Sequence, residues 1–198
     1  MKKTYSVGNK RVRIEYDDDT AMSPREWDNL GTIATWHRRY NLGDEQPRES
    51  VEEWKERLTE WEEGDAETPE EKFNRLFVWL PVYMYDHGGV TINTTGFSCP
   101  WDSGQVGIIY VSRENLKKEG ISEEQAKGCL RGEIEVYDQF LRGDVYYFVT
   151  EEYDVETGEW VEVDSCGGFY GDEWETNGMA DHCPVLRDES GVWSESGV

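Results

Sequence analysis

The first sixteen residues alternate apolar and polar side chains in two short runs. Thr4–Val7 and Arg11–Tyr16 are rich in β-branched and aromatic residues, which favour strands. Gly8-Asn9-Lys10 lies between them and offers the positive φ angles that a tight turn requires. The pattern therefore predicts an N-terminal β-hairpin.

Two later segments place apolar residues three and four positions apart, the spacing of an amphipathic helix. Thr68-Pro69-Glu70-Glu71 combines an N-cap residue, a first-turn proline and carboxylates, so a helix begins there, and we expect it to continue to Pro81. The other segment is Glu49–Glu63, with an acidic back and one apolar stripe. That stripe consists of Val51, Trp54, Leu58 and Trp61.

Two further helices are predicted from their caps. Ser122-Glu123-Glu124-Gln125 begins a long helix that extends to Leu141, where Gly143 is placed to end it. Ser23-Pro24 begins a short helix, because Gly31 follows soon after it. The chain thus contains three to four helices.

The middle of the chain changes to strand-like runs. Val82–Tyr85 and Val90–Thr95 flank the turn Asp86-His87-Gly88-Gly89, and Gln105–Val111 follows as a third apolar run. Because these strands are close in sequence, we expect them to form an antiparallel meander.

A last hairpin is predicted in the final quarter. Asp144–Tyr153 and Glu159–Ser165 flank the turn Glu156-Thr157-Gly158. Side chains switch faces at each residue of a strand, so Glu159 and Glu162 cannot share one face. The fold expected for the whole chain is a single α+β domain over residues 1–183, with antiparallel hairpins and a meander packed against the helices. Residues 184–198 are expected to form a loosely held tail.

The charge of the chain is unusually negative. The formal net charge is -23, and residues 151–198 hold 14 Asp or Glu side chains against one basic side chain, Arg187. A small domain usually carries a net charge of magnitude about 2 to 8. Acidity of this size builds a field that attracts basic surfaces or imitates the phosphates of a nucleic acid. Solubility and adaptation to high salt are the alternative explanations.

Composition favours a folded soluble protein despite this charge. Nine Trp and eleven Tyr argue against disorder, and no apolar run approaches the roughly 18 residues of a membrane span. Two lysines follow Met1 without an apolar segment behind them, so no secretory signal is expected. We predict a cytoplasmic protein with reduced cysteines, since the four cysteines show no CxxC pairing.

One loop region contains the residue types of a cysteine hydrolase. Cys99 could serve as the nucleophile, His87 as its base, Asp86 or Asp102 as the orienting group and Gln105 as an oxyanion donor. No spacing fixes their geometry, and a proline follows the cysteine instead of a helix start. Packing of Cys99 and Trp101 in a loop between strands is the favoured interpretation, so we expect no enzyme activity.

Metal, cofactor and direct nucleic-acid sites are not expected. Asp181-His182-Cys183 lacks the paired spacing of a zinc site, and Asp17-Asp18-Asp19 lacks the pattern of a calcium loop. Gly167-Gly168-Phe169-Tyr170-Gly171 lacks the lysine of a phosphate-binding loop. Trp36-His37-Arg38-Arg39-Tyr40 could stack on a single strand of nucleic acid. We expect Arg38 and Arg39 to pair instead with the acidic helix near Glu52 and Glu56.

Three segments carry a resemblance to other proteins. They are Arg25–Asp44, Tyr85–Gly89 and Ser98–Gly107. With these segments, most of the chain resembles uncharacterised acidic proteins encoded by bacteriophages and mobile elements. The resemblance implies a small accessory protein from a setting where acidic inhibitors of host defence nucleases occur, and it implies no catalytic residues.

The resulting hypothesis is an acidic binding protein. It would imitate nucleic acid and block the basic site of a restriction or CRISPR nuclease in the host bacterial cell. Alternatives are the cysteine hydrolase and a non-catalytic structural or regulatory phage protein. The carboxylates predicted to contact the partner form two sets. The first comprises Glu151, Glu152, Asp154, Glu156, Glu159, Glu162, Asp164, Asp172, Glu173 and Glu175, and the second comprises Glu52, Glu53, Glu56 and Glu60.

Overall fold

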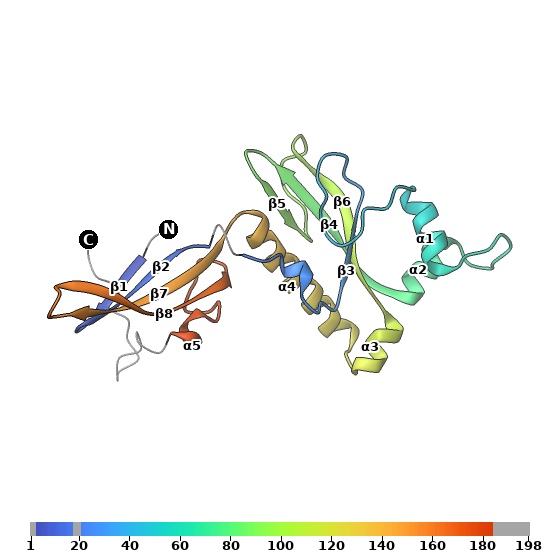
Figure 1. Cartoon of the computed structure of the whole chain (residues 1–198). Coiled ribbons are helices and arrows are strands. Elements are labelled where there is room, and N and C mark those ends of the chain that lie inside the picture. The colour runs from blue at the N-terminus through green and yellow to red at the C-terminus, as the bar shows by residue number, and fades with distance from the viewer. Residues whose placement is uncertain (1–2, 18–20, 184–198) are drawn as a thin grey trace. The chain divides into compact units, whose positions relative to one another are not determined.

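The computed structural model describes residues 3–17 and 21–183, which form two compact units (Figure 1). The middle unit spans Pro24–Asp138. The terminal unit combines Met1–Ser23 with Gln139–Val198. Each unit contains its own four-stranded antiparallel sheet, and helices accompany both sheets, so the predicted α+β class is confirmed. The predicted tail, residues 184–198, lies outside the described residues.

The terminal unit is built from two hairpins that lie side by side. Its strands are β1 (Lys3–Val7), β2 (Lys10–Tyr16), β7 (Val145–Asp154) and β8 (Glu159–Tyr170), in the spatial order β1-β2-β7-β8. Both hairpins agree with the sequence pattern. The two chain segments of this unit are therefore joined by the pairing of β2 with β7, which no local pattern indicates.

One face of this sheet is covered by the chain that follows β8. Trp174 is buried there and donates its indole N–H to the hydroxyl of Tyr5 at 2.9 Å. The short helix α5 (Met179–His182) completes the cover, with Met179 buried in the same cluster as Phe148. The aromatic residues of the last quarter thus hold its backbone in a packed structure.

β8 is longer than its sequence pattern suggests. It continues past Ser165, where the predicted strand ends, to Tyr170 and includes the glycine pair Gly167-Gly168. The ladder shifts register there, and Gly168 has a φ of 80°, as in a β-bulge that uses a left-handed glycine. The N–H of Gly168 donates to the carboxylate of Asp17 at 3.0 Å.

The middle unit has the strand order β3-β6-β4-β5. These strands are β3 (Thr32–Thr35), β4 (Phe77–Asp86), β5 (Val90–Asn93) and β6 (Ser103–Ser112). β4 and β5 form the expected hairpin, but β6 pairs with the other side of β4, so the three strands are not in meander order. β3, which the sequence pattern did not reveal, pairs with the outer side of β6.

The helices of the middle unit follow its capping signals closely. Among its described residues they are η1 (Pro24–Glu26), α1 (Val51–Thr59), α2 (Pro69–Leu76), α3 (Arg113–Glu119) and α4 (Glu123–Leu141), of which the last three residues of α4 belong to the terminal unit. α2 begins with a capping box at Thr68, where its sequence predicted the helix start, and α1 begins with a capping box at Ser50 that was not predicted. α3 was not expected.

The predicted extension of the second helix to Pro81 is wrong. α2 ends at Leu76, and Phe77 begins β4, which passes through Pro81. A proline is tolerated there because β5 pairs only with Tyr83–Asp86, so one edge of β4 is open at Pro81. The apolar residues after Leu76 fit either periodicity, and pairing with β6 decides for the strand.

The sheet of the middle unit lies between two helical layers (Figure 1). Ile108 and Tyr110 of β6 belong to an aromatic cluster with Trp54 of α1 and Phe73 of α2. On the opposite face Ile109 is fully buried near Leu130 of α4.

A buried cluster of charged groups fixes α4 to the chain before β3. The guanidinium of Arg25, which is 7% exposed, pairs with Asp44 at 2.6 Å and with Glu133 of α4 at 3.0 Å. Glu133 also accepts the backbone N–H of Leu30 at 2.8 Å. The carboxylates are thus satisfied by several donors, the condition under which buried charges are tolerated.

Candidate partner-binding surface

The β7–β8 hairpin distributes its carboxylates over two faces. Residues directly opposite each other in an antiparallel pair share a face. Asp154 therefore shares a face with Glu159, and Glu151 shares the other face with Glu162. The prediction that Glu159 and Glu162 lie on different faces is confirmed. We call the face of Glu151 and Glu162 the arginine face, because Arg11 of β2 is paired with Glu151 on it.

Glu151 belongs to the interior of the arginine face. It is only 7% exposed and accepts from the side chains of Arg11 and Arg13, the latter at 3.1 Å. The hydrogen bond from Arg11 is the main cause that lowers the pKa of Glu151 below its usual value. Its charge is compensated within the sheet. Glu151 is therefore not available to a partner, although it was predicted to contact one.

Two further carboxylates of the hairpin have local roles. Glu152 pairs with Lys10 across β2 and β7 at 2.9 Å, with both side chains about half exposed. Asp154 accepts the backbone N–H of Glu156 at 2.8 Å and so fixes the turn. That hydrogen bond lowers the pKa of Asp154. Both carboxylates remain within reach of solvent.

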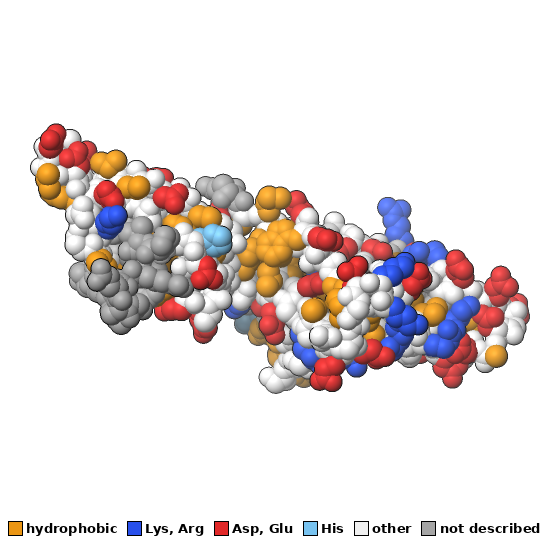
Figure 2. All heavy atoms as spheres, turned by 90° about the horizontal axis from the view of Figure 1, so that it is seen from below, with side chains coloured by type: hydrophobic (Ala, Val, Ile, Leu, Met, Phe, Trp, Pro, Cys, Tyr) orange, Lys and Arg blue, Asp and Glu red, His pale blue; other side chains and the backbone are white. Residues whose placement is uncertain are grey.

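The remaining carboxylates of the hairpin are exposed and uncompensated. Glu156, Glu159, Glu162 and Asp164 are all exposed, and none of them forms an ion pair with any described residue. No Lys or Arg occurs anywhere between Arg142 and Arg187 in the sequence. On the face shown in Figure 2, most of the charged side chains at the left end are Asp or Glu, with hydrophobic side chains between them, whereas acidic and basic side chains are mixed at the right end.

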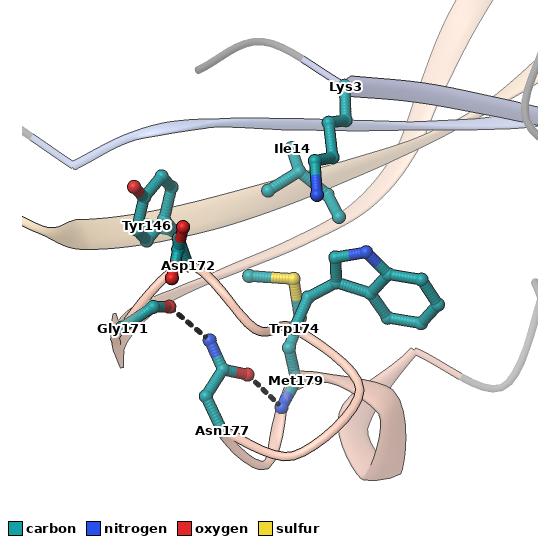
Figure 3. Close-up of a pocket in the computed structure, with 8 residues that line it drawn as sticks. All are labelled: Lys3, Ile14, Tyr146, Gly171, Asp172, Trp174, Asn177 and Met179. Atoms are coloured by element: carbon teal, nitrogen blue, oxygen red, sulfur yellow. Dashed lines mark hydrogen bonds between the residues drawn. The ribbon is translucent and has the colours of Figure 1, made fainter.

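Asp172, Glu173 and Glu175 surround the buried Trp174 in the loop after β8, and all three are exposed. Asp172 also lines a small cavity with Lys3 and Trp174 (Figure 3). The cavity has a volume of about 10 Å³, which is no more than a single water molecule occupies. The cavity is too small to bind a ligand, so it gives Asp172 no binding role.

The second predicted set lies on α1, in the other unit, among carboxylates that are mostly paired. Glu53 caps its own helix by accepting the N–H of Ser50 at 2.9 Å, and this hydrogen bond lowers its pKa. Glu52 and Glu60 are exposed, and Glu56 is half-buried. The neighbouring acids of the α1–α2 hairpin carry ion pairs. These pairs are Lys55–Glu70, Arg57–Glu49, Lys72–Asp65 and Arg75–Glu67.

Among the described residues, Arg38 and Arg39 do not form the expected ion pairs with Glu52 and Glu56 of α1. Arg39 forms its ion pair with Asp86 at the end of β4, at 3.3 Å, and Tyr40 donates to the same carboxylate at 3.0 Å. The guanidinium of Arg39 also lies over the ring of Tyr40. The charge of Arg39 is therefore offset by the strand end, not by Glu52 or Glu56.

The predicted hydrolase residues meet around Asp102, with the aspartate in the central position. Its carboxylate accepts from the thiol of Cys99 at 3.9 Å and pairs with His87 at 3.4 Å. Cys99 makes no hydrogen bond to a histidine among the described residues, although a cysteine nucleophile needs an imidazole at that position. Gln105 donates to the carbonyl of Gly107 at 3.3 Å.

An open polar depression of about 360 Å³ lies beside this cluster. Its lining includes His37, Asp86, Asp102 and Trp101, whose side chain is 92% exposed. Cys99 and His87 are not among the residues that line it. No local pattern indicates that His37 approaches the end of β4, because the two segments are almost fifty residues apart. The geometry does not assemble a nucleophile, base and pocket.

No group of three or more His, Cys, Asp or Glu side chains within residues 3–17 and 21–183 is arranged to hold a metal ion. Of the Asp181-His182-Cys183 segment, Cys183 is buried in the core and the ring of His182 packs near Phe169. No helix in the described part of the chain is long and apolar enough to cross a membrane.

Comparisons of the chain with protein-family models, with curated proteins and with solved structures gave no match.

Proposed function

We propose that this protein is an acidic binding protein whose β7–β8 hairpin takes the place of nucleic acid in the basic site of a partner protein. The partner we propose is a host defence nuclease of the restriction or CRISPR type, inhibited in the cytoplasm of a bacterial cell. The identity of the partner rests on the resemblance to acidic proteins of bacteriophages and mobile elements.

One observation carries the proposal: exposed carboxylates without counterions are held on a folded hairpin. Glu159, Glu162 and Asp164 project from a strand, and packing around Trp174 orders the chain behind them. A decoy for phosphates needs charges that are already in position, because ordering a flexible acidic segment on binding would cost conformational entropy.

The spacing of the carboxylates supports imitation of a short stretch of backbone. Carboxylates two residues apart on a strand share a face at a spacing of about 6.6–6.8 Å, as Glu152 and Asp154 do, although these two also bind Lys10 and the N–H of Glu156. Phosphates along one strand of duplex DNA recur with an axial rise of roughly 3.4 Å, so the two spacings are of the same order. The surface is small, so we expect it to replace a few phosphates and to leave the rest of a DNA channel open.

The proposal is tested by cleavage assays with a panel of restriction and CRISPR nucleases. We expect inhibition of at least one nuclease, competitive with DNA, and lost as NaCl rises from about 0.05 M to about 0.5 M because the charges are screened. The variant E159Q/E162Q/D164N should weaken inhibition by roughly a hundredfold, if each lost contact with a charged group contributes about 1 kcal/mol.

The matched control is E52Q/E56Q/E60Q, which removes the same charge from α1 without disturbing the cap at Glu53. We expect this control to inhibit almost as well as the unaltered protein. Equal losses for both triple variants would show that only net charge matters. The absence of inhibition of any nuclease in the panel would contradict the proposed function.

A further inference from the structure

β8 lies at the end of its sheet and has no strand on its outer side among the described residues. Such an edge carries unpaired backbone N–H and C=O groups, on which another chain can add a strand. Residues Val161–Gly168 are exposed without interruption, including the apolar side chains of Val161 and Val163 at 51% and 60%. Both faces of the strand are therefore accessible next to its edge.

The ladder identifies which residues turn their backbone outward. Tyr153 donates its N–H to Asn9, on the β2 side of β7. Because an antiparallel ladder alternates, Trp160, which is opposite Tyr153, directs its own backbone groups away from β7. Glu162, two residues further, does the same. The open segment ends soon afterwards, because the N–H of Ser165 is occupied by the carboxylate of Asp164 at 2.9 Å.

The charge along this edge selects its occupant. A second copy pairing through β8 would bring Glu159, Glu162 and Asp164 close to their own equivalents, with no Lys or Arg between Arg142 and Arg187 to compensate. A strand with basic side chains would instead be attracted by these carboxylates. The indole ring of Trp160 on this strand can bind a guanidinium group, because the guanidinium of Arg11 lies 4.4 Å from the centre of that ring.

We propose that the partner adds a basic extended segment to the outer edge of β8 along Trp160–Asp164. Its backbone would pair with the outward groups of Trp160 and Glu162. Basic side chains at alternate positions would lie beside Glu162 and the indole of Trp160 on the arginine face. This inference rests on the proposed function, since it specifies how a basic partner would be held at the same hairpin.

The test uses the full chain and a fluorescently labelled short peptide in which lysine and valine alternate. A second peptide has the same side chains and charges, but every backbone nitrogen is methylated, so it cannot donate to a strand edge. We expect the unmodified peptide to bind about tenfold more tightly in fluorescence anisotropy, which corresponds to the loss of one or two backbone hydrogen bonds.

Variants of the protein provide a second, independent test of strand addition. E162P removes the outward N–H at an edge position where proline is tolerated, and E162Q removes only the charge. E162P should weaken the unmodified peptide several-fold more than E162Q does, and it should leave the weak binding of the methylated peptide at the E162Q level. If E162P fails to fold, the two peptides still give the answer with the unaltered chain.

The outcomes separate this inference from the proposed function. Equal, salt-sensitive binding of both peptides would support the proposed acidic binding surface but would overturn the inference of strand addition. Lack of binding by either peptide would overturn both. A dimer in sedimentation equilibrium that E162P dissociates would assign the edge to a second copy and overturn the basic segment.

Discussion

The α1–α2 hairpin and the β7–β8 hairpin are both acidic, yet their charges are arranged differently. Residues 41–75 hold 13 acidic and 5 basic side chains, and α1 and α2 bring most of those basic groups against carboxylates. Residues 143–186 hold 12 acidic side chains and no basic one. Lys10, Arg11, Arg13 and Arg142 pair with carboxylates of this second set. Seven others are exposed and form no ion pair with a described residue, namely Glu156, Glu159, Glu162, Asp164, Asp172, Glu173 and Glu175.

The difference shows that net charge alone does not locate a charged binding surface. Helices place side chains three and four residues apart on one side, so acidic and basic residues close in sequence can neutralise each other. A carboxylate in a hairpin strand needs a basic residue two positions away on the same strand or on a neighbouring strand, and among the described residues β8 has a neighbouring strand on one side. An edge strand in a segment without basic residues therefore keeps its full charge.

The largest effect is expected from Glu151, the exception within the β7–β8 hairpin. E151Q leaves Arg11 and Arg13 without their shared carboxylate and should lower the free energy of unfolding by about 2–3 kcal/mol, less than for a fully buried pair because the arginines are partly exposed. Urea denaturation followed by tryptophan fluorescence measures this. E162Q on the same face is the control. A comparable loss of unfolding free energy in both variants would show that Glu151 does not differ from the exposed Glu162 in its contribution to stability.

Acid should destabilise the protein through the paired carboxylates. The pKa values of Glu151, Glu49, Glu67 and Asp65 are lowered, mainly by hydrogen bonds from Arg11, Arg57, Arg75 and Lys72 respectively. Their contribution is complete above the unfolded pKa values near 4 and is lost as the pH falls through the lower folded values. Thermal unfolding between pH 6 and about pH 2.5 should therefore show a falling Tm below about pH 4. A flat profile would contradict these pairings.

Removing a single carboxylate charge should change the Tm slightly, in opposite directions for the two hairpins. E67Q removes the partner of Arg75 and should lower the Tm slightly. E159Q relieves repulsion with Asp154, which lies directly opposite, and should raise the Tm slightly. Differential scanning calorimetry of the two variants at low salt measures both shifts. The comparison fails if both substitutions move the Tm in the same direction.

The smallest effect is a local response to salt. Screening should weaken the ion pairs of α1–α2 and reduce the repulsion within β7–β8. Native-state hydrogen exchange at rising NaCl should then show slightly less protection for the amides of α1 and slightly more for those of β7. Equal changes in both hairpins would indicate that their charges are arranged alike.

Local signals predicted much of the secondary structure. The cap at Thr68 and the turns at Gly8 and Gly158 depend on neighbouring residues, so they can be recognised without the fold. The signal failed at Phe77, where an apolar run is compatible with either a helix or a strand and a distant partner, β6, makes the choice.

Most carboxylates of the candidate surface were predicted from the sequence, but the sequence could not show which of them are buried and paired and which are exposed. Glu151 and Glu162 look alike along the chain. Glu151 is buried because β2 places two arginines beside it, while Glu162 lies opposite it on an open edge. The pairing of Arg39 with Asp86 was missed for the same reason, since it joins residues 47 positions apart.

The amount of charge, its concentration in the last quarter and the aromatic residues that order that quarter follow from composition and local pattern alone. Which carboxylates are neutralised, the division into two sheets and the edge position of β8 among the described residues become clear only in the folded chain. Those properties depend on contacts between distant segments, such as β2 with β7, whose partners no local pattern specifies.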